Sequence, residues 1–234
     1  MLLGIDTSGA VSVAVARGEL TGPALEILQV RSDARSRHHD EVLLDLIEET
    51  LRAAEVERGE LTGVVVGRGP GPFTGLRVGL VSARSIAAVL GVPLHGLSSL
   101  DALAHQALAA AGPAQDGPLT VGVALDARRR EVYHARYRRD TAGDVARIAD
   151  PAVNTPADAA AELTACDLLV GSGTGLYPEL LPATAELGHV DAGHLLLAAA
   201  ALAARGEDLT STEPMYLREP DAARPTARKS ALGR

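Results

Sequence analysis

Residues 67–80 of this chain read GRGPGPFTGLRVGL. They follow the apolar run at 64–66 and lead into an apolar-periodic segment that reaches about Leu90. A β-branched run followed by two Gly-Pro pairs cannot continue as a strand, and Thr74 is a good helix N-cap. The stretch therefore predicts a strand, a tight loop and a helix N-terminus whose free backbone N–H groups point at whatever lies above them.

The glycines of this stretch do not form a familiar nucleotide motif, because they match neither G-x-x-x-x-G-K-[ST] nor G-x-G-x-x-G. Gly75 and Gly79 lie inside the predicted helix, where each costs about 0.8–1 kcal/mol relative to alanine. With Ala83 and Ala87 they repeat every four residues and form one narrow face of small side chains. Such a face allows another backbone to approach closely, either the protein's own sheet or the helix of a partner.

The composition excludes several classes of function. The chain has 234 residues, of which 47% are hydrophobic, but only one Phe, four Tyr and no Trp, so stacking platforms for single-stranded nucleic acid are scarce. A net charge of -8 argues against a stand-alone nucleic-acid binder. Cys166 is the single cysteine, which excludes an intramolecular disulfide and fits a reducing cytosol. We expect a soluble cytoplasmic protein, since the apolar run at 195–204 is too short to cross a bilayer.

The order of predicted elements repeats along the chain. The first half reads βββαβαβα, with strands near 2–5, 12–16, 24–30, 64–66 and 93–97 and helices near 40–54, 74–90 and 99–111. A linker rich in Gly and Pro covers 112–118, and the pattern then restarts. The second half has predicted strands near 120–125, 131–138, 148–153 and 168–170, helices near 156–165 and 194–204, and a glycine loop at 171–175.

This order predicts an α/β protein of two lobes, each a mixed sheet flanked by helices. We expect an N-terminal lobe over 1–112 and a C-terminal lobe over 118–234 with a flexible basic tail at about 219–234. Two such halves around a cleft resemble the actin-like, sugar-kinase and Hsp70 (ASKHA, RNase H-like) fold. Nucleotide binds between the lobes in that architecture.

The central stretch carries a specific family resemblance. Residues 67–79 resemble the G-R-G-P-G-S-F-T-G-x-R-x-G signature of the bacterial TsaB (YeaZ) family, with Pro72 in place of the usual serine. Further matches follow in order at 5–7, 124–128, 131–133, 170–173 and 214–218, so the resemblance covers almost the whole chain. Proline removes the hydroxyl and one backbone N–H, which weakens any contact made through that serine.

The resemblance implies a non-catalytic scaffold and activator of the TsaD threonylcarbamoyl transferase. Together with the ATPase TsaE, the two proteins form threonylcarbamoyladenosine in tRNAs that read codons beginning with A. It further implies a heterodimer with TsaD, a homodimer when the chain is alone, contact with tRNA only through the complex, and no membrane partner. No cofactor is expected to bind tightly, although ATP or ADP could bind at the complex interface.

The related enzyme TsaD carries an N-H-x-E-x-H segment whose two imidazoles bind a metal. The corresponding residues here are 98–103, in which Ser99 and Leu103 occupy the histidine positions. His38 and His39 are sequence neighbours and do not face one point on a helix. We therefore expect no metal site and no catalytic residue. The alternative is an autonomous ATP-dependent phosphotransferase or a metallopeptidase of the same fold.

Two groups of residues are candidates for function. Asp6, Thr7 and Ser8 lie where actin-like folds place their first phosphate-binding hairpin, and they predict either a nucleotide contact or only a tight turn. The predicted partner interface lies on the helices near 40–54 and 74–90, because the apolar positions of the first helix look too widely spread for one buried stripe. Its residues are Leu43, Ile47, Phe73, Thr74, Gly75, Arg77, Gly79 and Ala83. A bulky side chain at Gly79 is then expected to abolish partner binding without unfolding the chain.

Overall fold

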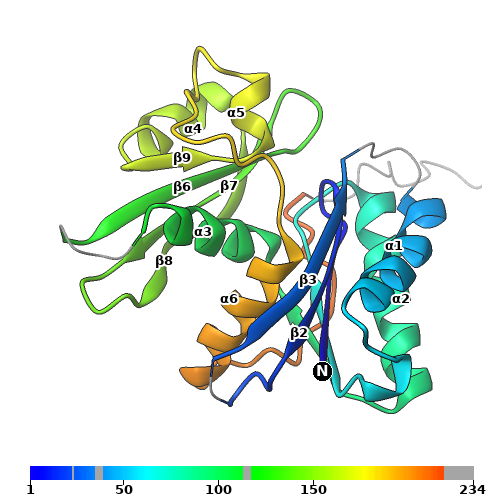
Figure 1. The fold of residues 1–234 in the computed structure, drawn as a ribbon. Helices are drawn as coiled ribbons and strands as arrows, with labels where there is room; N and C mark the ends of the chain where they lie inside the picture. Colours follow the sequence, from blue (N-terminus) through cyan, green and yellow to red (C-terminus); the bar gives the residue numbers. More distant parts are fainter. Residues whose placement is uncertain (23, 35–38, 113–116, 219–234) are drawn as a thin grey trace, which may run out of the picture.

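The computed structural model describes residues 1–22, 24–34, 39–112 and 117–218, and it folds into two sheets with their helices (Figure 1). The predicted basic tail at 219–234 lies outside these residues, as do the side chains of the neighbouring pair His38 and His39.

The first sheet has five strands in the order β3-β2-β1-β4-β5. These are β1 (Leu2–Asp6), β2 (Val11–Arg17), β3 (Glu26–Asp33), β4 (Gly63–Gly67) and β5 (Leu94–Leu97). β1, β2 and β3 form an antiparallel meander, whereas β4 and β5 join parallel to β1. β1 and β4 are buried along their whole length, as near-continuous apolar central strands should be.

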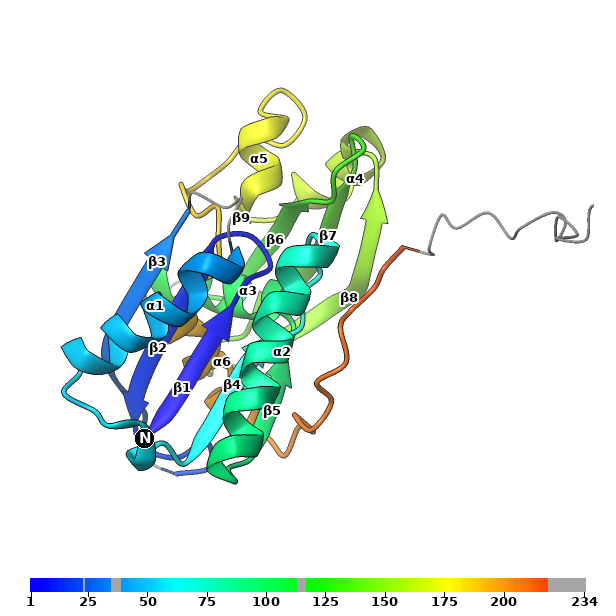
Figure 2. The ribbon, with the colours of Figure 1, turned by 90° about the vertical axis from the view of Figure 1, so that its right-hand side faces the viewer.

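Two helices cover one face of this sheet. They are α1 (His39–Ala53) and α2 (Phe73–Leu90), which lie side by side over the strands (Figure 2). A short 3₁₀ helix (Arg58–Glu60) precedes β4. α2 is the one helix of the described ranges that is long and apolar enough to cross a membrane, and its inner side packs on β4 as in a core helix.

The second sheet has four strands in the order β8-β7-β6-β9. They are β6 (Leu119–Asp126), β7 (Val132–Arg139), β8 (Val145–Asn154) and β9 (Leu168–Val170). Helices α4 (Pro156–Leu163) and α5 (Ser172–Leu176) pack on it. The order repeats β3-β2-β1-β4 of the first sheet, so the predicted two-lobed α/β architecture is confirmed. The predicted glycine loop at 171–175 is instead mostly the short helix α5, which begins after Gly171.

Two helices each pack on the sheet of the other lobe rather than on the sheet that they follow in sequence. α3 (Ser99–Ala110) follows the first sheet in sequence but packs on β6, whereas α6 (Ala192–Ala204) follows the second sheet but packs on β1 and β2. The amide of Ala192 donates to Ser12 Oγ on β2 at 2.9 Å. Residues 118–234 are thus not one packing unit, which corrects the predicted lobe boundary.

The physical reason is the composition of α6. Its sequence AGHLLLAAAALAA is apolar on nearly every side, so the helix requires cover on more than one face. The first sheet supplies one cover and α3 the other, and Figure 1 shows α6 between them. The larger core of the molecule therefore lies between the sheets, and a second core lies under α1 and α2.

Candidate functional site

The turn between β1 and β2 is closed by its own side chains. Asp6 Oδ1 accepts from the amide and the hydroxyl of Ser8, at 2.9 and 2.6 Å, and its Oδ2 accepts from Ser99 Oγ at 2.6 Å. Thr7 Oγ1 donates to the carbonyl of Gly75 at 2.8 Å. Burial raises the pKa of Asp6 above its usual value, although these hydrogen bonds act in the opposite direction. The side chains of Asp6, Thr7 and Ser8 are buried and engaged inside the fold.

The glycine-proline loop after β4 packs directly on this turn. A Cβ at Gly71 would lie 2.5 Å from the carbonyl oxygen of Ser8, so only glycine fits there. The helix that follows begins at Phe73, with Pro72 as its N-cap and no side-chain cap. The predicted capping role of Thr74 is therefore wrong by two positions, because the fixed φ of proline already suits the entry to the helix.

The small-residue face of α2 points inward. Gly75, Gly79 and Ala83 are buried, and a Cβ at Gly79 would lie 2.3 Å from Thr7 Oγ1. The close neighbour that offsets the helix cost of these glycines is thus the chain's own β1–β2 turn. Their prediction as partner-contacting residues is wrong.

Two interface residues predicted on α1 are buried as well. Leu43 is 0% exposed and Ile47 is 7% exposed, and both belong to the core under the helices. With Leu46 and Leu51 they fall at positions i, i+3, i+4 and i+8, which is one ordinary buried stripe. The apolar positions of this helix were therefore not too widely spread. Leu44 is the exception, and it is 61% exposed.

The opposite face of α2 is exposed along its whole length. Its residues also repeat every four positions, two out of phase with the small residues, and we call them the outer stripe: Phe73, Arg77, Val81, Ser85 and Val89. Phe73 and Arg77 were predicted in the interface and lie on this face, and Thr74 is exposed beside them. Val81, Val89 and Leu44 were missed, although the same fourfold spacing could have found the first two.

A cluster of aromatic and cationic groups marks the N-terminal end of the outer stripe. The guanidinium carbon of Arg77 lies 3.8 Å from the ring centroid of Phe73, and Arg77 Nε donates to Tyr216 Oη at 2.9 Å. The rings of Phe73 and Tyr216 stack with centroids 5.7 Å apart. Phe73 and Tyr216 are both exposed, at 56% and 46%. No local pattern in the sequence pairs Tyr216 with residues so far away along the chain.

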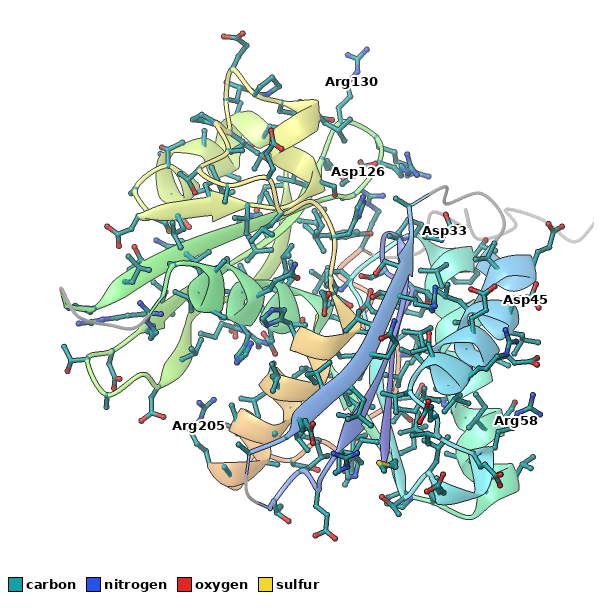
Figure 3. All side chains as sticks on the ribbon, viewed as in Figure 1. Asp33, Asp45, Arg58, Asp126, Arg130 and Arg205 are labelled. Carbon is teal, nitrogen blue, oxygen red and sulfur yellow. The ribbon has the colours of Figure 1, made fainter. Side chains whose placement is uncertain are left out.

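The corresponding turn of the second lobe, between β6 and β7, is open. Arg128, Arg129 and Arg130 are exposed and have left-handed φ values of 60°, 54° and 63°. Asp126 Oδ1 accepts from the amide of Arg128 at 2.7 Å, and Figure 3 shows Arg130 projecting from the tip of the lobe. The two turns thus differ, since the first is sealed by the glycine-proline loop and the second is not.

A cavity of about 520 Å³ lies between α3, α6, β7 and β8. Three of its lining residues bind one another, since Asp101 Oδ1 accepts from Tyr137 Oη at 2.6 Å and from Arg147 Nη2 at 2.5 Å. Burial, and then the charge of Asp101, raise the pKa of Tyr137 well above its usual value. These polar groups are already paired and fix α3 to the second sheet. The sequence did not indicate this cavity.

The helix α3 carries no metal site of the TsaD type. Ser98 is its N-cap, and Ser99 Oγ donates to Asp6. His105 and His194 approach to 3.3 Å between their Nδ1 atoms, and burial and the charge of His194 lower the pKa of His105 to about 4. Across the described ranges, no group of three or more His, Cys, Asp or Glu residues is placed to hold a metal ion.

Known proteins share this architecture. A family model described as TsaD, tRNA N6-adenosine threonylcarbamoyltransferase, matches residues 32–168. The solved structure of YeaZ from Pseudomonas aeruginosa matches with a TM-score of 0.75 and 30% identity, covering 92% of this chain and 99% of that one. The chain belongs to the TsaB (YeaZ) family. A second Pseudomonas structure, of a protein with similarity to peptidase YEAZ, matches with a TM-score of 0.74 and 30% identity, covering 93% of this chain and 99% of that one.

A named sequence relative agrees with this family. The tRNA threonylcarbamoyladenosine biosynthesis protein TsaB of Escherichia coli is 34% identical over 107 residues, which cover 46% of this chain and 44% of that protein. The match thus spans less than half the length of that relative. An uncharacterized protein of Mycobacterium tuberculosis is 37% identical over 226 residues, covering 94% of this chain and 93% of the relative.

Proposed function

We propose that this chain is a non-catalytic subunit of the assembly that makes threonylcarbamoyladenosine in tRNA. It binds and activates a TsaD-type transferase through the outer stripe of α2 together with Leu44 on α1. The observation that carries the proposal is the solvent exposure of Phe73, Val81 and Val89 on the outer stripe, in a member of the TsaB family. The docking surface is therefore the face opposite to the glycines.

The distribution of exposed apolar residues supports this surface. Eight large hydrophobic residues of the described ranges are exposed, and Leu44, Phe73, Val81, Val89 and Tyr216 gather on or beside α1 and α2. A patch of this kind on an otherwise charged surface is typical of a protein interaction site. Aromatic residues and arginine, as in Phe73 and Arg77, are the types enriched where binding energy concentrates.

The same surface accounts for self-association. A face that serves one partner stays exposed when that partner is missing, and two copies can then cover it through a twofold contact. We therefore expect a homodimer when the chain is alone and a heterodimer when the transferase is present. The TsaE-type ATPase and the tRNA are reached through the transferase, in the cytoplasm.

The chemistry of the chain's own residues supports a subunit without catalysis. The one buried carboxylate of the β1–β2 turn, Asp6, already accepts three hydrogen bonds from Ser8 and Ser99. This arrangement does not favour the alternative phosphotransferase, which requires a carboxylate free to act as a base. The alternative metallopeptidase requires metal ligands, and the described residues offer no cluster of three.

The predicted nucleotide contact at Asp6, Thr7 and Ser8 fits poorly with their side chains, because all three make hydrogen bonds inside the fold. The glycine-proline loop also covers the turn, as the close approach of Gly71 to Ser8 requires. We keep ATP or ADP at the complex interface as a proposal and assign no side chain of this turn to it.

Reconstitution tests the proposal. The chain, the TsaD-type protein, the TsaE-type ATPase and unmodified tRNA are combined with ATP, bicarbonate and threonine plus the enzyme that makes the activated carbamoyl donor, and the modified nucleoside is quantified by mass spectrometry. We expect modification only when this chain and the transferase are both present, and none when the transferase alone is omitted. Modification without the transferase would show that the chain is itself the enzyme, and full modification without the chain would show that it is dispensable.

A further inference from the structure

The segment that follows α6 runs as an extended strap, residues 209–218, along the free edge of the first sheet (Figure 2). The amide of Gly96 on β5 donates to the carbonyl of Leu209, and the amide of Met215 donates to the carbonyl of Arg68, both at 2.8 Å. The strap thus pairs with the edge strand near its start and with the glycine-proline loop near its end. Because of this pairing, the last part of the strap lies beside the N-terminal end of α2.

Side chains of α2 hold the strap at two places. Arg84 donates to the carbonyl of Thr212 and to the carboxylate of Glu213, both at 2.8 Å. About two turns earlier on the helix, Arg77 donates to Tyr216, whose ring stacks on Phe73. The aromatic part of the outer stripe is therefore built from two segments, since Phe73 belongs to α2 and Tyr216 to the strap.

The end of the strap reaches the second lobe. Arg218 forms an ion pair with Glu131, which lies at the start of β7 beside the open arginine turn. Both side chains are mostly shielded from solvent, with 25% and 33% of their surfaces exposed, so salt screens this pair less than a surface pair. Only Leu217 separates Arg218 from Tyr216, and the ion pair therefore restrains the position of the ring.

We propose that Tyr216 is a partner-contacting residue and that the Arg218–Glu131 pair is a latch that positions it, so that the second lobe completes the docking surface of the first. The inference rests on the proposed function and names a further part of the same surface. Its occupant is the TsaD-type subunit, presenting an apolar side chain to the two rings and a carboxylate to Arg77. The bond to Tyr216 uses one of the five N–H donors of the guanidinium, which leaves donors for that carboxylate.

Affinity for the transferase tests the contact. Titration calorimetry compares the wild-type chain with Tyr216→Ala, Tyr216→Phe and the control Arg17→Ala on β2, which removes an exposed ion pair with Glu26 on β3. Tyr216→Ala should weaken binding about thirtyfold, as expected of an aromatic hot spot. Tyr216→Phe keeps the ring and should lose only a few fold, and the control should match the wild type.

A charge reversal tests the latch. Arg218→Glu should weaken binding about tenfold, and the double variant Arg218→Glu with Glu131→Arg should restore it, which a merely structural loss would not do. Hydrogen exchange gives a second readout that needs no partner. The amide of Met215 should exchange faster in Arg218→Glu and return toward the wild-type rate in the double variant.

The outcomes separate this inference from the proposed function. Unchanged affinity in Tyr216→Ala, while Leu44→Glu abolishes binding, overturns the inference and leaves the proposed function in place. Tighter binding in Tyr216→Ala also overturns it, because the strap would then compete with the partner. Failure of the charge reversal to restore either readout overturns the latch. A wild-type chain that does not bind the transferase overturns both proposals.

Discussion

The two faces of α2 have the same four-residue periodicity, but one face is buried and the other is exposed to solvent. The inner face repeats small residues every four positions, at Gly75, Gly79, Ala83 and Ala87, and all of them are buried. The outer stripe repeats every four positions from Phe73 to Val89, and all of it is exposed. The two series are offset by two positions, which corresponds to about 200° around a helix of 3.6 residues per turn. Small residues thus mark where α2 packs on its own lobe, and the stripe opposite them is exposed to solvent.

The inner face is fixed by one contact. Thr7 on the β1–β2 turn lies against Gly79 and bonds to the carbonyl of Gly75, so the turn and the helix are locked together. The first prediction breaks this contact with Gly79→Val. The added side chain has no space beside Thr7, and we expect a loss of about 3 kcal/mol in the free energy of unfolding, measured with urea.

A valine on the other side of the same helix is the control for that variant. Ala88 is exposed, so Ala88→Val should change the free energy of unfolding by less than about 1 kcal/mol, mostly through helix propensity. Equal effects of the two substitutions would contradict the assignment of the faces. A folded Gly79→Val chain that merely loses its partner would restore the original prediction that the glycines form the interface.

The hydroxyl of Thr7 gives the second prediction. Thr7→Val keeps the shape of the side chain but removes the hydroxyl that donates to the buried carbonyl of Gly75. The free energy of unfolding should fall by about 1–2 kcal/mol. Thr210→Val, at an exposed position, should have a smaller effect. A Thr7 variant as stable as the wild type would mean that the lock depends on packing alone.

The third prediction concerns Asp6, whose pKa is raised by burial above its usual value. The folded state therefore binds the proton more tightly than the unfolded state, and stability falls as pH rises from about 4 through the folded-state pKa. In Asp6→Asn this slope should vanish, so the variant gains stability relative to the wild type as pH rises. Urea unfolding at several pH values measures the difference, and a difference that shrinks with pH would contradict the raised pKa.

The smallest effect is expected on the outer side. Arg84 and Glu213 form an ion pair with 44% and 79% of their side-chain surfaces exposed, and such pairs contribute little. Arg84→Ala should lower the free energy of unfolding by less than about 1 kcal/mol, as measured by urea unfolding, while loosening the strap. A loss as large as that of Gly79→Val would mean that the strap is part of the core.

Local patterns predicted the architecture well. The order of strands and helices, apart from the short helix α5, and the helical period of residues 40–54 follow from neighbours in sequence, and the structure confirms them. The position of α6 could not be predicted in the same way. The helix packs on the first sheet because the apolar face of that sheet, which is distant in sequence, is otherwise exposed. The residue pattern of the helix itself does not contain that information.

The candidate site was predicted only in part for the same reason. The fourfold repeat of Gly75 and Gly79 correctly indicated a close approach, but the sequence could not say whether the close neighbour was internal. Phe73 and Arg77, which were predicted in the interface, lie on the exposed face of α2. Tyr216 was missed, because its contact with Phe73 joins positions with no shared local pattern.

The central claim is that the outer stripe and Leu44 bind the transferase. The most direct measurement is the affinity of the TsaD-type subunit for the double variant Leu44→Glu with Val81→Glu. Its matched control is Ile148→Glu with Leu176→Glu, which places the same charges at exposed apolar positions of the second lobe. We predict a loss of at least about a hundredfold for the first variant and less than about twofold for the control, with both chains folded. Undiminished binding by the first variant, or an equal loss in the control, would contradict the account.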